Sequence, residues 1–97
     1  MKQRDAWLIP GLQPSFGYVC TGDCMTPTFY PGEIAYIHPQ NDFDDGQVVA
    51  VEVDGWRMLK RAYHVPDGVR FVPDNPKHKP FTVKTGVHII GVAVARG

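Results

Sequence analysis

A chain of 97 residues with 43% hydrophobic side chains has room for one small domain with a single core. Ten Lys and Arg residues balance ten Asp and Glu residues, which argues against a nucleic-acid binder, because such binding depends on neutralising phosphates. No apolar stretch is long enough for a transmembrane helix or a signal peptide, so we expect a cytoplasmic protein with reduced cysteines and no membrane contact.

In chain order, residues 1–15 are predicted to be a lead-in or linker, since Pro and Gly interrupt any regular element there, and residues 16–97 are predicted to form the domain. Asp54-Gly55 and Asp67-Gly68 are hairpin signals between runs of β-forming residues. A short helical turn is expected at 24–28 and a loop at 73–80. The predicted strands are 16–21, 33–38, 47–53, 56–65, 69–72 and 87–95.

The fold class that follows is mostly β. No segment supports an amphipathic helix of ten residues or more, and the predicted strands are short and punctuated by Gly and Pro. We therefore expect a small, strongly curved β-sheet or partial barrel.

A thiol lies in a tight turn, Gly22-Asp23-Cys24-Met25-Thr26-Pro27, and Lys60 follows on the predicted strand 56–65. A nucleophile paired with a lysine can cleave peptide bonds without a histidine. Such a lysine acts as a base only if its surroundings remove its charge. Strand alternation puts Lys60 on a mostly apolar face and leaves the charged residues on the other. The apolar face is predicted to hold Trp56, Met58, Lys60 and Ala62, and the opposite face Arg57, Leu59, Arg61 and Tyr63.

Four segments resemble, in order, the LexA-like family of self-cleaving repressors, which includes phage repressors and UmuD-type DNA-damage proteins. The resemblance covers most of residues 16–95. Its segments are Gly22-Asp23-Cys24-Met25-Thr26-Pro27-Thr28, residues 32–39, residues 46–61 ending in Lys60-Arg61, and residues 71–76 together with 90–92.

This resemblance implies a C-terminal domain that forms a homodimer and cuts its own chain when a RecA–single-strand-DNA filament docks. Cys24 would be the nucleophile and Lys60 the general base or acid, while Gly22, Asp23 and Met25 would shape the turn. No cofactor is implied, and DNA would be bound only through an N-terminal domain that this chain lacks.

Two features depart from the family pattern. Cys24 stands where the family has serine, which favours a repressor from a phage or mobile element. The bond that family members cut would lie before Met1, so we expect a processed product, a truncated chain or a member that does not cut itself.

A Cys–Lys pair can rest in either of two protonation states, a thiolate–ammonium pair or a neutral thiol–amine pair. A free thiol has a pKa near 8.5 and a free lysine near 10.4, so in water the two groups favour a thiolate–ammonium pair. Burial favours the neutral pair, in which Lys60 must act as the base. The larger sulfur can also be misplaced in a site shaped for serine, and small misplacements cost about 10²-fold in rate.

Two other functions remain open: a non-catalytic oligomerisation module controlled by an antirepressor, and a UmuD-type polymerase accessory subunit. For the remaining polar clusters we prefer a structural or solvated role over the binding of a metal ion or phosphate. We expect no metal at Cys20 and Cys24, solvated loops at Asp42-Phe43-Asp44-Asp45 and Lys77-His78-Lys79, and structural roles for His64 and His88, each satisfied by a neighbour.

Overall fold

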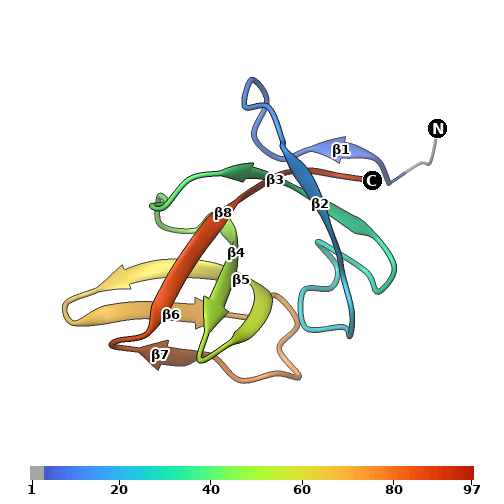
Figure 1. Cartoon of the computed structure of the whole chain (residues 1–97). Coiled ribbons are helices and arrows are strands. Elements are labelled where there is room, and N and C mark those ends of the chain that lie inside the picture. Colours follow the sequence, from blue (N-terminus) through green and yellow to red (C-terminus); the bar gives the residue numbers. More distant parts are fainter. Residues whose placement is uncertain (1–3) are drawn as a thin grey trace.

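The computed structural model describes residues 4–97, which form eight strands in one antiparallel sheet (Figure 1). The strands are β1 (Ala6–Trp7), β2 (Phe16–Val19), β3 (Ile34–Pro39), β4 (Val48–Val53), β5 (Trp56–Val65), β6 (Gly68–Val72), β7 (Phe81–Val83) and β8 (Val87–Arg96). Their order is β2-β3-β8-β4-β5-β6-β7, with β1 beside β8. Among the described residues β2 and β7 do not pair, so the sheet is open, and the mostly β prediction is confirmed.

The last strand, β8, connects the two halves of the curved sheet. It pairs with β1 and β3 at one end and with β4 at the other, and it runs through the middle of the molecule in Figure 1. The register of β8 shifts once against β3, at Tyr36/Ile37, and once against β4, at Ala50/Val51. Such irregularities bend a strand and increase its twist, which accounts for the curvature.

Side chains are buried on both faces of the central strands. In β4, Val48 and Ala50 belong to one core cluster, while Val49, Val51 and Val53 belong to a second. Because both faces of β4 are covered, its side chains are nearly all apolar instead of alternating between apolar and polar. The first cluster also contains the segment that follows β2, and it therefore supports the predicted nucleophile turn.

All six predicted strands are present, with ends that move by no more than two residues. The two shortest strands were not predicted: β1 pairs with β8, and β7 pairs with β6. Residues 24–28 form a turn and no helix. The predicted lead-in begins at residues 1–3, which lie outside the described residues. Between residues 4 and 97 no helix is long and apolar enough to cross a membrane.

Candidate active site

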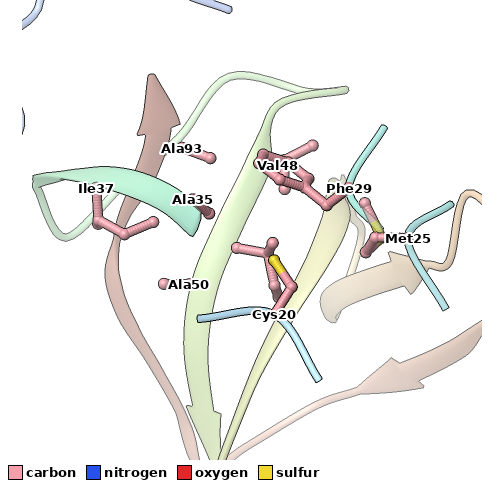
Figure 2. Packing of buried hydrophobic residues seen from close by; sticks show 9 residues of the cluster. Cys20, Met25, Phe29, Ala35, Ile37, Val48, Ala50 and Ala93 are labelled. Carbon is pink, nitrogen blue, oxygen red and sulfur yellow. The ribbon is translucent and has the colours of Figure 1, made fainter. Parts of the chain in front are cut away.

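The turn that carries Cys24 is anchored by apolar side chains on both sides of the cysteine. Gly22 has a φ of 70°, a left-handed conformation that glycine adopts at little cost, and it redirects the chain after β2. Met25 and Phe29 are 3% and 1% exposed, and the Phe29 amide donates to the Met25 carbonyl at 2.9 Å. Figure 2 shows these two side chains in the cluster with Cys20 and Val48. The core therefore fixes the backbone around the thiol.

The structure brings Cys24 and Lys60 together. Lys60 lies opposite Val49 in the β4–β5 register, and its Nζ donates to the Cys24 Sγ at 3.0 Å. Both residues are half-buried, and both line a hollow of about 160 Å³. The hollow is closed on its apolar side by Met25, Phe29 and Leu59. Among the described residues each of these two side chains makes its one hydrogen bond to the other, so the pair faces the hollow as a unit.

The predicted contrast between the two faces of β5 is wrong at two positions. Trp56, expected on the buried face, is 76% exposed, because it begins the strand at the tip of the β4–β5 hairpin. Leu59, expected on the polar face, is 5% exposed and belongs to the core cluster beneath the turn. A strand at the centre of a strongly curved sheet is covered on both faces, which simple alternation does not describe.

The second cysteine lines the same hollow but is chemically different. Cys20 is buried, and burial raises the pKa of its thiol to about 11. Neighbouring Tyr18 also has a raised pKa, first because of burial and then because of the nearby thiols. Both cysteines are free. Cys20 is therefore a neutral, weakly reactive core thiol at neutral pH.

Behind the pair, a charged network connects the two chain segments. Arg61, the residue after Lys60, donates two hydrogen bonds of 2.8 Å to the Asp74 carboxylate, and the Thr28 hydroxyl donates to the same group. Burial alone would raise the pKa of Asp74, but the hydrogen bonds from Arg61 and Thr28 outweigh it and hold that pKa below its ordinary value. Asp74 is thus a carboxylate at neutral pH, and it joins β5 to the end of the nucleophile turn.

The predicted loop 73–80 contacts the turn directly, and its basic tip 77–79 is exposed as expected but also binds the turn through His78. His78 Nε2 lies 2.6 Å from Asp23 Oδ1, and this hydrogen bond lowers the pKa of Asp23. Asn75 donates from its backbone N to the Cys24 carbonyl and from Nδ2 to the Asp23 carbonyl, both at 3.0 Å. Asp74 and Asn75 lie in a segment of the family resemblance, whereas nothing in the sequence marks His78 as a partner of the turn.

The other polar clusters have structural partners. His64 lies 2.7 Å from Asp45 and 3.2 Å from Asp42, and its ring stacks on Phe43 at 4.1 Å. The predicted partner for His64 is thus present, and the acidic loop is tied to β5. For His88 no ring hydrogen bond is present among the described residues. Across residues 4–97 no group of three His, Cys, Asp or Glu side chains is arranged to hold a metal ion.

Comparison with known families decides the affiliation. The model of the family described as "Peptidase S24-like" matches residues 4–94. The chain belongs to the Peptidase S24-like family. This match confirms the LexA-like resemblance, and it includes the turn, the strand that carries Lys60 and the loop 73–80.

Several curated relatives of this Peptidase S24-like chain are LexA repressors. The LexA repressor of Anaeromyxobacter dehalogenans is 33% identical over 97 aligned residues, which are 95% of this chain and 42% of the relative. LexA repressor 2 of Geobacter sulfurreducens is 35% identical over 77 residues, which are 75% of this chain and 38% of the relative. The chain thus spans about two fifths of the length of these relatives.

Proposed function

We propose that this chain is the dimer-forming, self-cleaving C-terminal domain of a LexA-like transcriptional repressor and that Cys24 and Lys60 form its catalytic pair. The observation that carries the proposal is the 3.0 Å contact between Lys60 Nζ and Cys24 Sγ in a hollow of a Peptidase S24-like domain. A nucleophile within hydrogen-bond reach of its acid–base partner is the arrangement that acyl transfer requires.

In the proposed reaction the Cys24 sulfur attacks the carbonyl carbon of an amide in the hollow. A C–S bond forms, and backbone N–H groups of the turn would stabilise the oxyanion. If the resting pair is thiolate and ammonium, Lys60 donates its proton to the departing amine as the C–N bond breaks. If the resting pair is neutral, Lys60 first takes the thiol proton and then returns it to the amine. In both cases neutral Lys60 then activates the water that hydrolyses the thioester.

Dimerisation is proposed for the face formed by β1, β3 and β8. A hollow of about 410 Å³ lies there, with Trp7, Tyr36 and Ala95 in its lining, and the Trp7 side chain is 56% exposed. An exposed aromatic residue beside an apolar hollow is typical of a protein–protein contact. Sedimentation velocity should find a dimer that Trp7→Glu converts to a monomer.

The remaining partners belong to the whole repressor. We propose a RecA filament as the partner that triggers cleavage, with an antirepressor as the alternative, and DNA contact through a part of the protein outside this chain. The replacement of serine by Cys24 supports an origin in a phage or mobile element.

Cleavage is tested by incubating the chain with a peptide library of broad sequence coverage and identifying new termini by mass spectrometry. We expect cleavage that Cys24→Ala and Lys60→Ala both abolish and that Cys24→Ser retains in part, since serine restores the family's nucleophile. Assays from about pH 7 to about pH 10 report the apparent pKa values of the pair as a whole, because the thiolate–ammonium and thiol–amine states carry the same number of protons. Cleavage that persists in Cys24→Ala would overturn the proposed role of the thiol.

A second candidate is a non-catalytic oligomerisation module controlled by an antirepressor. The observation in its favour is that Cys24 is half-buried and packs against the core cluster, as a small apolar side chain would. This candidate predicts a dimer without any cleavage that depends on Cys24 and Lys60.

A further inference from the structure

Two residues of the loop between β6 and β7 contact the part of the nucleophile turn beside Cys24. Asn75 binds two successive carbonyl groups of the turn, those of Asp23 and Cys24, each at 3.0 Å. His78 binds the Asp23 carboxylate at 2.6 Å. These contacts join residues more than fifty positions apart, so the turn is held from outside as well as by the core beneath it.

The same loop also holds the strand that carries the lysine. Asp74, which precedes Asn75, takes two hydrogen bonds from Arg61, and Arg61 follows Lys60 on β5. The Asp74 side chain is 14% exposed and that of Arg61 is 29% exposed, so solvent screens this pair only partly. Adjacent residues of one loop therefore bind the backbone at the nucleophile and the side chain of the residue that follows the lysine.

We propose that Asn75 and His78 are positioning residues of the Cys24–Lys60 pair, an inference that rests on the proposed peptidase function. Asn75 fixes the Cys24 backbone, and with it the distance between sulfur and Nζ. His78 offsets the negative charge of Asp23, the residue beside the nucleophile, which would otherwise oppose negative charge on the sulfur. The charged groups that face Asp23 are His78 and Lys77.

Geometry explains why these contacts matter for reactivity. The Sγ–Nζ distance of 3.0 Å leaves little tolerance, because a hydrogen bond to sulfur weakens as the two atoms separate. Displacement of a catalytic group by about 1 Å can cost about 10²-fold in rate. A loop that binds both the turn backbone and the Arg61 side chain limits such displacement.

The test measures alkylation of Cys24 by iodoacetamide in a chain in which Cys20→Ala leaves one thiol. The readout is the coupling factor, defined as the alkylation rate with Lys60 divided by the rate with Lys60→Ala. We expect Asn75→Ala to lower this factor about tenfold, since the Nδ2 bond to the Asp23 carbonyl is lost and the backbone bond to the Cys24 carbonyl alone holds the turn less firmly. Asn75→Asp, which keeps the shape and the backbone donor, should lower it in the same direction and serves if Asn75→Ala does not fold.

A charge-rescue cycle tests His78 separately. At about pH 6, His78→Gln should slow the alkylation of Cys24 about threefold, because the partner that lies 2.6 Å from the Asp23 carboxylate is lost. Adding Asp23→Asn should restore the rate, and about 1 M salt should reduce the effect because the groups are exposed. Lys79→Gln, which removes a positive charge from the same loop, is the matched control and should change neither readout by more than about twofold.

The outcomes separate this inference from the proposed function. If Lys60→Ala leaves alkylation unchanged in the otherwise native chain, the catalytic pair itself is refuted. If the rate depends on Lys60 but the coupling factor stays constant in both Asn75 variants, Asn75 is not a positioning residue. If Asp23→Asn fails to restore the rate of His78→Gln, the charge-offset role of His78 is overturned.

Discussion

Replacing Asp74 by alanine should destabilise the domain, because the network behind the site loses the carboxylate at its centre. The Asp74 carboxylate accepts two hydrogen bonds of 2.8 Å from Arg61 and one from Thr28. Hydrogen bonds to charged groups contribute about 1.5–3 kcal/mol each when buried, and a partner left unpaired adds its own cost. Because Arg61 is partly exposed and retains its bond to the Gly46 carbonyl, we expect a net loss of about 2 kcal/mol.

Urea unfolding followed by circular dichroism measures this loss directly, and thermal unfolding should show a midpoint lower by about 10 °C for a domain of this size. The matched control is Asp67→Ala, which breaks an exposed pair with Lys84 at 3.2 Å. That control should change the free energy of unfolding by no more than about 0.5 kcal/mol. Equal losses in the two variants would refute the reasoning that burial makes the Asp74 network strong.

The pH dependence gives the same prediction an independent check. The folded-state pKa of Asp74 is lowered, so its contribution is fully present above the ordinary carboxyl pKa of about 3.9 and is lost as the pH falls through the folded value. The stability difference between the native chain and Asp74→Ala should therefore be constant near neutral pH and shrink below about pH 4. A difference that persists unchanged at pH 2–3 would contradict the assignment of an ionised Asp74.

Three further changes test the fold around the site. A Cβ on Gly91 would lie 2.3 Å from the His38 carbonyl oxygen, so Gly91→Ala should lower the urea midpoint by an amount equivalent to about 1–3 kcal/mol, and an unchanged midpoint would refute the β3–β8 register. Phe71 is fully buried, so Phe71→Ala should cost about 3–5 kcal/mol in the same assay, and a loss below about 1 kcal/mol would contradict its placement in the core. The pKa of His64 is raised by the hydrogen bonds that its ring makes to Asp45 and Asp42, so its stabilisation is present below the ordinary imidazole pKa and is lost as the pH rises through the folded value. The stability gap between the native chain and His64→Gln should therefore be larger at about pH 5.5 than at about pH 8.5, and the reverse order would refute the ion pairs.

The strands could be predicted from sequence because their signals are local. The Asp54-Gly55 hairpin and the apolar run of β4 each specify a conformation within a few residues, and both are found as predicted. The short strands β1 and β7 carry no such signal, since each of them exists only through pairing with β8 or β6.

Part of the candidate site could also be predicted from the sequence. Cys24 and Lys60 could be singled out by residue type and family spacing, and the structure places them in contact. The loop contacts could not be predicted in this way, because periodicity says nothing about which loop folds back on a distant turn. From the sequence His78 is therefore expected to be solvated, whereas in the structure its ring lies 2.6 Å from the Asp23 carboxylate.

The central claim is that Cys24 and Lys60 form one reactive pair, and its most direct test is the pH profile of Cys24 alkylation by iodoacetamide. The profile is measured from about pH 5 to about pH 10 in Cys20→Ala and in Cys20→Ala with Lys60→Ala. We expect Lys60→Ala to change the rate about tenfold or more, because the Lys60 Nζ that donates to the sulfur at 3.0 Å is lost. Superimposable profiles in the two proteins would contradict the claim and leave the oligomerisation module as the better account.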